Sequence, residues 1–412
     1  MFKSNRNPQF RSKFSEDIFY TKYSHEGAET FHELACTLVE DVCQDKLSKD
    51  DKEALIDHIS NLRFIPGGRY LYYAGRDKKF FNNCYLLKAE EDTREDWADL
   101  SWKSESCLMT GGGIGIDYSV YRPEGQTLKG TGGISSGPIP KMQMINSIGQ
   151  KVMQGGSRRS AIYASLNWQH DDVDKFLKAK NWFDMPVGNT GKTLFDIKQD
   201  DFNFPAPLDM TNISVNYDTE WLLNYWEKGE IGDVFRTNVH QALRTAEPGF
   251  SFNFFEKENE TLRNACTEVT SEDDSDVCNL GSLNFARIDD LNQLQEVVQL
   301  ATQFLLCGTL RATLPYEKVY QVRDRNRRLG LGLMGLHEWL IQRGHRYETT
   351  SELHRWFKVY EAESDKVARS FANQLNISVP VAVRAVAPTG TIGILAGTST
   401  GVEPIFAVAY KR

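Results

Sequence analysis

The chain has 412 residues, which is enough for one large domain or two ordinary ones with a substantial core. Its net charge is -8, and no stripe of Lys and Arg interleaved with aromatic residues is present, which argues against a nucleic-acid platform but not against small nucleotides. No apolar run approaches membrane-spanning length or follows the first residues, so we expect a cytoplasmic protein with no membrane partner.

The cysteines are odd in number and widely spread, which excludes the disulfide framework of a small secreted domain. They are Cys36, Cys43, Cys84, Cys107, Cys266, Cys278 and Cys307. None has the spacing of a zinc site, so we predict no metal site and expect thiols with redox roles instead. Three of them, Cys36, Cys43 and Cys307, lie in helical apolar patterns and are assigned to packing.

Residues 1–25 show no clear period and are interpreted as an arm, whereas the apolar spacing in residues 26–62 predicts two amphipathic helices. We therefore take residues 1–62 as an N-terminal region and residues 63–412 as the main domain. In the main domain, Cys84 follows two asparagines, and residues 92–97 start a helix with Asp92 or Thr93 as its cap.

Residues 111–115 (GGGIG) form a strand-like glycine run, which by itself is a weak signal. A flexible loop then precedes a predicted helix over residues 140–152 and a second glycine-rich loop at residues 154–160 (QGGSRRS). Residues 188–193 (GNTGKT) end like a P-loop, but two residues separate the glycines where that motif needs four. We interpret this segment as a surface loop and not as the site of a P-loop hydrolase.

Residues 211–215 predict a buried strand, and a helix begins at Trp221. Residues 264–268 (NACTE) place an amide, a thiol and a carboxylate at alternate positions, which in an extended segment would share one face. A buried cysteine between loop residues is the ordinary alternative. The acidic run at residues 272–276 is expected to be solvated, because such runs are seldom buried.

The apolar spacing in residues 291–310 follows a helix closely, and a second long helix is predicted over residues 351–375. Between them, residues 328–336 (RLGLGLMGL) are expected to form a helix with a glycine-rich face. Residues 381–386 predict a strand that ends at the turn PTGTI, residues 388–392. Hydroxyls and free N–H groups at a helix start suit a phosphate.

Five of these segments occur in the order in which they resemble the catalytic subunit of ribonucleotide reductase, over a region from about residue 64 to the end. They are Cys84 with its asparagines and residues 111–115, 154–159, 264–284 and 388–392. The resemblance implies an α/β barrel of ten strands in two half-barrels. Residues 264–268 then lie on a loop, the finger, that threads the barrel centre, and a short helical N-terminal region without an ATP cone precedes it.

The resemblance also implies how the ribose 2′-hydroxyl is removed. A Cys266 thiyl radical takes the 3′-hydrogen, Glu268 accepts the 3′-hydroxyl proton as general base, and Asn264 holds the sugar. Cys84 and Cys278 then supply two electrons and become a disulfide.

The same resemblance assigns the remaining site residues. Substrate contacts are expected from Asn83, Gly112, Gly113, Pro388, Thr389, Gly390, Thr391 and Ile392. An allosteric deoxynucleotide or ATP effector, at a homodimer interface, is expected to bind Asp92, Arg122, Gln154 and Arg158. The substrate is a ribonucleoside diphosphate, with a triphosphate as the alternative.

The radical source is left open between a ferritin-like partner subunit with a dimetal site, which we favour on the chain's shortness, and adenosylcobalamin. An external dithiol, thioredoxin-like or glutaredoxin-like, is expected as reductant. The chain stops short of the family's C-terminal cysteine pair and tyrosine dyad, so those parts are either truncated or supplied by another chain. A non-catalytic nucleotide-sensing homologue is a further alternative.

Overall fold

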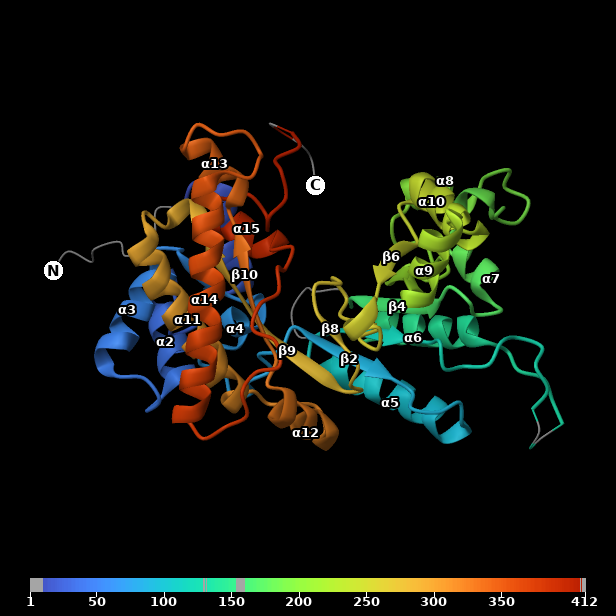
Figure 1. Ribbon diagram of the computed structural model, residues 1–412, viewed down its shortest axis with the longest axis horizontal. Coiled ribbons are helices and arrows are strands. Elements are labelled where there is room, and N and C mark those ends of the chain that lie inside the picture. Colours follow the sequence, from blue (N-terminus) through green and yellow to red (C-terminus); the bar gives the residue numbers. More distant parts are fainter. Residues whose placement is uncertain (1–9, 129, 131, 153–159, 408, 410–412) are drawn as a thin grey trace. The chain divides into compact units, whose positions relative to one another are not determined.

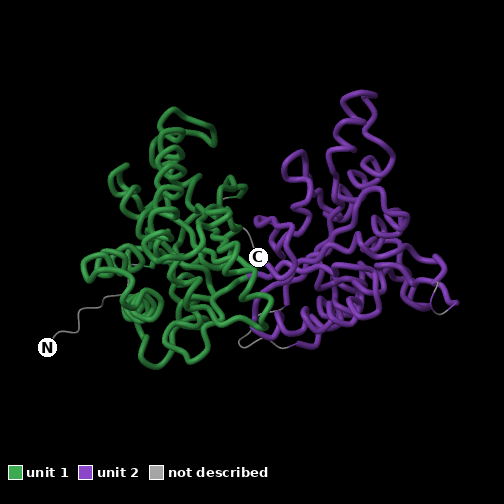
Figure 2. Tube along the Cα trace, turned by 60° about the horizontal axis from the view of Figure 1, so that its bottom comes forward, with its two compact units in different colours: residues 1–83, 277–412 green, residues 84–276 purple. Residues whose placement is uncertain are grey.

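The computed structural model describes residues 10–128, 130, 132–152, 160–407 and 409. The chain divides into two compact units. Unit 1 comprises residues 1–83 and 277–412, and unit 2 comprises residues 84–276 (Figure 2). The boundary falls just before Cys84 and again just before Cys278, so one member of the predicted redox pair belongs to each unit.

Unit 2 is built on five parallel strands that pair in chain order. These are β2 (Cys84–Lys88), β3 (Gly113–Asp117), β4 (Ile162–Asn167), β5 (Thr211–Tyr217) and β6 (Gly249–Phe252). Parallel neighbours require crossover connections, and helices supply them, as the labelled α5, α6, α9 and α10 show in Figure 1. Cys84 is the first residue of β2 and pairs with Gly113, the first residue of β3.

The helices and short elements of unit 2 complete its list. They are α5 (Arg94–Met109), α6 (Pro138–Lys151), α7 (Val173–Leu177), η1 (Trp182–Asp184), α8 (Leu194–Asp200), α9 (Thr219–Lys228), α10 (Asp233–Thr245), η2 (Phe255–Lys257), β7 (Leu262–Arg263) and β8 (Thr270–Ser271). The predicted cap of α5 is Thr93, whose hydroxyl accepts the N–H of Asp96. The P-loop-like segment is exposed and ends at Thr193, the cap of α8, which confirms its interpretation as a surface loop.

Unit 1 has a smaller set of strands. In it, β1 (Phe64–Pro66) pairs antiparallel and β10 (Leu329–Met334) pairs parallel with β9 (Asp276–Asn284). Its helices are α1 (Lys13–Lys22), α2 (Phe31–Cys43), α3 (Lys49–Ser60), α4 (Gly68–Tyr73), η3 (Phe285–Arg287), α11 (Leu291–Arg311), α12 (Glu317–Asn326), α13 (Leu336–Gln342), α14 (Ser351–Gln374) and α15 (Gly390–Ala396).

The core of unit 1 is centred on α11, which packs lengthwise against α14, as Figure 1 shows. Twelve residues of α11 are buried, most of them apolar, and they include all but one of residues 300–309, so the second half of the helix is buried on every side. The helices predicted over residues 26–62, 140–152, 291–310 and 351–375 are therefore confirmed, with small shifts at their ends. The expected arm differs, because its residues Lys13–Lys22 form α1, which packs on α15.

The helix predicted over residues 328–336 is wrong, because the segment forms the strand β10. Its alternation of leucine and glycine has the two-residue period of a strand. The glycines are required by neighbours: a Cβ on Gly330 would lie 2.3 Å from Leu280 Cδ2, and one on Gly332 would lie 2.5 Å from the carbonyl oxygen of Ala385.

Two further expectations need correction. The acidic run is not wholly solvated, because Asp274 is buried, where Lys103 Nζ reaches its Oδ2 at 2.9 Å and the Lys88 N–H donates to its Oδ1 at 2.9 Å. Residues 381–386 form one isolated parallel bridge, Leu331 with Arg384, and not a full strand. The fold class is α/β, as expected. Among the described residues, no helix is both long and apolar enough to span a membrane.

Candidate active site

The finger, residues 264–268, is the turn that joins β7 to β8 in unit 2, and those two short strands pair antiparallel. The Thr267 N–H donates to the Asn264 carbonyl oxygen at 2.9 Å, and Thr267 has a positive φ of 69°. The segment is therefore a loop, and the idea of an extended segment with three side chains on one face is wrong. The turn itself brings its polar side chains to one end of the hairpin.

Asn264 connects the finger to the predicted redox thiol at the start of β2. Its side chain is fully buried. Its Oδ1 accepts the Val269 N–H at 3.0 Å, which fixes the amide orientation, and its Nδ2 donates to Cys84 Sγ at 3.3 Å. An amide with both ends engaged holds the thiol in a defined direction.

The charges at this turn act on one another. Burial raises the pKa of the Cys84 thiol, and the nearby Glu268 and Cys266 raise it further, while the hydrogen bond from Asn264 lowers it. Burial also raises the pKa of Glu268, with a hydrogen bond from Asn264 opposing the shift. Glu268 Oε2 is buried and has no hydrogen-bond partner, whereas Cys266 is exposed. The turn thus offers an accessible thiol beside a carboxylate with spare acceptor capacity.

Glycines of β3 let the hairpin and the finger lie against the sheet. A Cβ on Gly115 would lie 1.6 Å from the Arg263 carbonyl oxygen, and one on Gly113 would lie 2.9 Å from Ala265 Cβ. Gly113 therefore has a packing role, and its expected substrate contact, like that of Gly112, stays a prediction. The glycine run is explained by the close approach of two backbones.

A cavity of about 640 Å³ opens beside the finger at the starts of β4, β5 and β6. Its lining is mixed: Tyr163, Asn212, Ile213, Ser214, Ala246, Glu247, Gly249, Phe250, Phe252, Arg263 and Thr267. Arg263 donates to Asn253 Oδ1 and to the Phe252 carbonyl oxygen, both at 3.1 Å, and so joins the hairpin to β6. Sequence analysis missed Arg263, and nothing in its local pattern distinguishes it.

The other predicted substrate and redox residues belong to unit 1. Cys278 is 1% exposed in β9, and Asn83 lies against Gly67, where a Cβ would approach its Nδ2 to 2.8 Å. Thr389 is buried just before α15, and its hydroxyl accepts the Gly401 N–H at 2.8 Å. The rest of the PTGTI turn follows it: Gly390, Thr391 and Ile392 form the first turn of α15, and Pro388 precedes Thr389.

The predicted effector residues divide into two groups. Asp92 and Arg122 form an ion pair in unit 2, and the Arg122 N–H also donates to Asp92 Oδ2 at 3.1 Å. Gln154 and Arg158 lie outside the described residues. Asn82, which sequence analysis did not single out, makes buried hydrogen bonds to the strand that carries Cys278. The only sequence feature that could have indicated a role for Asn82 is its position two residues before Cys84.

Unit 2 is thus an α/β unit whose parallel sheet carries a thiol at a strand start and has a cysteine-bearing turn held against it. The ribonucleotide reductase barrel domain family matches residues 82–185 and 219–362. This chain belongs to that family.

Relatives and solved structures agree with the assignment. The vitamin B12-dependent ribonucleoside-diphosphate reductase of Thermoplasma acidophilum is 29% identical over 86% of this chain and 49% of its own length. The enzyme of that name from Mycobacterium tuberculosis is 28% identical over 86% of this chain and 54% of its own. The ribonucleoside-diphosphate reductase subunit alpha of Chlamydia muridarum is 26% identical over 69% of this chain and 31% of its own.

The fold is shared with the class Id ribonucleotide reductase alpha subunit of Actinobacillus ureae. The TM-score is 0.77 at 17% identity, covering 96% of this chain and 76% of that one. This likeness confirms the predicted fold family. The chain spans about half the length of the B12-dependent relatives it matches.

Proposed function

We propose that this chain carries the active site for thiyl-radical reduction of ribonucleotides to 2′-deoxyribonucleotides. The observation that carries the proposal is the Asn264 amide, which contacts the Cys84 thiol at 3.3 Å from a turn that also presents Cys266 and Glu268. Thiyl-radical reduction needs an amide, thiols and a carboxylate close together, and the turn and the adjoining start of β2 supply an amide, two thiols and a carboxylate.

Each group has a task that suits its surroundings. Cys266 is exposed, so its thiyl radical can reach the ribose and take the 3′-hydrogen. Glu268, with its raised pKa and a buried oxygen that has no partner, is suited to accept the proton of the 3′-hydroxyl. Asn264 keeps the turn in register and orients the sugar by hydrogen bonding.

Cys84 and Cys278 act as the redox pair in this proposal. Together they give two electrons and two protons to the substrate, and a disulfide forms between their sulfurs. An external dithiol of the thioredoxin or glutaredoxin kind then reduces that disulfide. We place the enzyme in the cytoplasm, where thiols are kept reduced.

For the radical source we now favour adenosylcobalamin over a ferritin-like partner. Two B12-dependent relatives each match 86% of this chain, whereas the alpha subunit from Chlamydia muridarum matches 69%. When bound, adenosylcobalamin supplies an organic radical that can oxidise a thiol. The partner subunit stays the alternative.

We place the adenosyl part of that cofactor in the cavity beside the finger. Asn212, which lies in the lining, would hydrogen-bond the edge of the base. Arg263, the cation in this lining, is already bonded to protein oxygens, so the cavity suits a nucleoside better than a phosphate.

Substrate phosphates are assigned to the PTGTI turn. The N–H groups at the start of α15 would serve as donors there. The Thr389 hydroxyl, which accepts the Gly401 N–H, can still donate its own hydrogen. Asp92 and Arg122 are assigned to the allosteric nucleotide at a homodimer interface, together with Gln154 and Arg158. A diphosphate substrate is favoured by the names of the relatives.

The test is reduction of the four ribonucleotides, as di- and triphosphates, with adenosylcobalamin, a dithiol and each effector. Deoxynucleotide product that depends on adenosylcobalamin supports both the reaction and the cofactor. Product only with an added ferritin-like subunit supports the alternative. Effector binding without product under either condition would favour a nucleotide-sensing homologue and contradict the proposal.

A further inference from the structure

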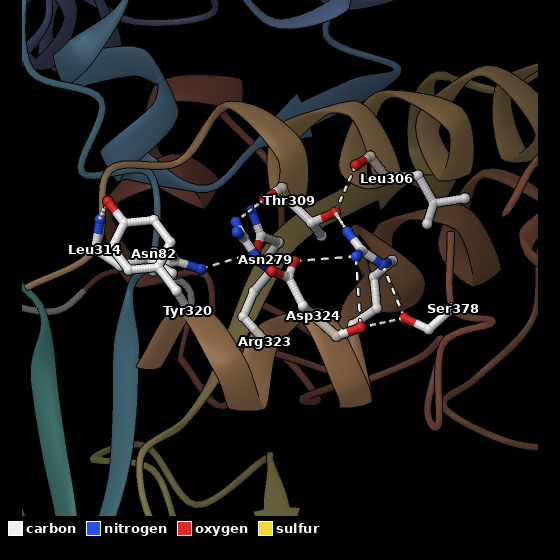
Figure 3. A network of polar contacts seen from close by, with 10 residues as sticks. Asn82, Asn279, Leu306, Thr309, Leu314, Tyr320, Arg323, Asp324 and Ser378 are labelled. Carbon is white, nitrogen blue, oxygen red and sulfur yellow. Dashed lines mark hydrogen bonds and ion pairs between the residues drawn. The ribbon is translucent and has the colours of Figure 1, made fainter. Parts of the chain in front are cut away.

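Two buried asparagines in unit 1 are hydrogen-bonded to one another beside the proposed redox cysteine of β9. Asn82 is fully buried and Asn279 is 1% exposed. Asn82 Nδ2 donates to Asn279 Oδ1 at 2.7 Å and to the carbonyl oxygen of Cys278 at 3.3 Å. Figure 3 shows the two amides next to the polar contacts of α12. Asn82 thus holds the main chain of Cys278.

Tyr70 anchors the other end of this chain of contacts. Asn279 Nδ2 donates to Tyr70 Oη. Burial raises the pKa of Tyr70, so its phenol stays neutral. The ring is stacked on Phe81 at 4.6 Å, and its Oη occupies the space where a Cβ on Gly308 would lie, 1.9 Å away. The phenol therefore has no room to shift toward α11.

Asn82 is held in its buried position by its donor atom alone. Asn82 Oδ1 is buried with no hydrogen-bond partner, and an unsatisfied buried polar atom costs about 1–3 kcal/mol. An apolar residue would avoid that cost, but it would leave Asn279 Oδ1 and the Cys278 carbonyl oxygen without this donor. The structural contribution of Asn82 is therefore the pair of acceptors that its Nδ2 holds.

Asn82 is also close to Cys84 along the chain. Asn82 precedes Cys84 by two residues, so their Cα atoms lie no more than about 7.6 Å apart wherever the chain turns. A disulfide requires Cα atoms about 4.4–6.8 Å apart. A hydrogen bond from Asn82 to the Cys278 carbonyl therefore ties the segment that leads into one thiol to the main chain of the other.

We propose that Asn82 and Asn279, anchored by Tyr70, are positioning residues that hold the main chain of Cys278 in place for disulfide formation with Cys84. This inference rests on the proposed function, which assigns these cysteines as the redox pair. Each cycle breaks two S–H bonds and forms one S–S bond. Two electrons and two protons pass to the ribonucleotide, whose 2′-hydroxyl leaves as water. The external dithiol then reduces the disulfide by exchange. The asparagines take no part in the chemistry and hold the main chain of Cys278.

The experiment measures the equilibrium between dithiol and disulfide for Cys84 and Cys278 in glutathione redox buffers. The full chain is used, with alkylation and peptide mass analysis as the readout. Asn82→Leu, which replaces the amide with an apolar side chain of the same branched shape, is expected to lower the equilibrium constant for disulfide formation about tenfold. Tyr70→Phe is expected to lower it less, and it serves as the second variant if Asn82→Leu does not fold.

Asn238 provides a matched control in unit 2. It is fully buried, and its Nδ2 donates to Tyr217 Oη at 3.1 Å and to the Gly249 carbonyl oxygen at 3.3 Å, the same chemistry away from the cysteines. Asn238→Leu is expected to change the free energy of unfolding but not the redox equilibrium.

The outcomes separate this inference from the proposed function. A wild-type disulfide whose equilibrium constant is unchanged in Asn82→Leu and in Tyr70→Phe would overturn the positioning role alone. An equal shift in Asn238→Leu would do the same, since it would reflect general destabilisation. Absence of a Cys84–Cys278 disulfide in the wild-type chain would overturn the redox pair and this inference together.

Discussion

The two buried cysteines of the proposed redox pair are held in different ways. Cys84 in unit 2 is contacted at its sulfur, where the Asn264 amide donates at 3.3 Å. Cys278 in unit 1 is held at its main chain, where the Asn82 amide donates to its carbonyl oxygen at 3.3 Å. The Asn264 amide orients the Cys84 thiol, and the Asn82 amide positions the strand β9, which carries Cys278.

The two contacts show that one site can control the protonation of one cysteine and the position of the other by separate hydrogen bonds. Contact at the sulfur affects protonation, because the hydrogen bond from Asn264 lowers the pKa of Cys84 against the effect of burial. Contact at the main chain of Cys278 acts on the carbonyl oxygen and fixes the position of the strand instead. Four further changes should test the site that surrounds these contacts, and they follow from the largest expected effect to the smallest.

Removing the third thiol should have the largest effect. Cys266→Ser is expected to abolish deoxynucleotide formation, because serine does not form a comparable radical, while nucleotide binding stays at the wild-type level. Turnover and equilibrium binding measure the two effects. Cys36→Ser, at a half-buried position of α2, is the control and should retain activity. Turnover by Cys266→Ser would show that the exposed thiol is not the reacting group.

A side chain on β3 should displace the hairpin that carries the finger. Gly115→Ala places a Cβ 1.6 Å from the Arg263 carbonyl oxygen. We expect a loss of at least about 3 kcal/mol in the free energy of unfolding, measured by urea denaturation. Gly130→Ala is the control, because a Cβ there has no neighbour within 4 Å. Equal stability of the two variants would contradict the observed packing of the hairpin against β3.

Glu268 should make stability depend on pH. Because burial raises its pKa in the folded state, the unfolded chain loses its proton first as pH rises. The free energy of unfolding should therefore fall from about pH 4.5, the ordinary value, up to the raised pKa. Glu268→Gln should lack this fall, so urea denaturation across that range should show the variant gaining stability relative to wild type. Parallel curves would mean that Glu268 is not buried.

The smallest effect on stability is expected for Asp92. Its ion pair with Arg122 is partly exposed, with 24% and 33% of the two side chains accessible, and such pairs contribute at most about 1 kcal/mol. Asp92→Asn should therefore change the free energy of unfolding by less than about 1 kcal/mol, yet weaken effector binding measured by calorimetry. Unchanged effector affinity would remove Asp92 from the regulatory site.

Much of the fold follows from sequence. The long helices were predicted from apolar spacing, since a helix such as α14 buries one periodic set of side chains. The strand β10 was not predicted. Its residues 330 and 332 must be glycine because of contacts with Leu280 and Ala385, and these residues are distant in sequence. Asp274 was placed in solvent because its partner, Lys103, is 171 residues away.

The candidate site was predicted only in part. Ordered motifs identified Asn264, Cys266 and Glu268, and the structure places them on one turn. Their arrangement depends on the positive φ of Thr267 and on the Val269 N–H, neither of which the local pattern reveals. Asn82 and Arg263 act through hydrogen bonds to other segments, so they carry no signal of their own.

The most direct test of the central claim is to map disulfides in the full chain after mild oxidation and, separately, after one turnover without external reductant. The account predicts one disulfide, between Cys84 and Cys278, with Cys36 and Cys107 recovered as thiols. Recovery of Cys84 and Cys278 as free thiols, or a bond from either to another cysteine, would contradict it.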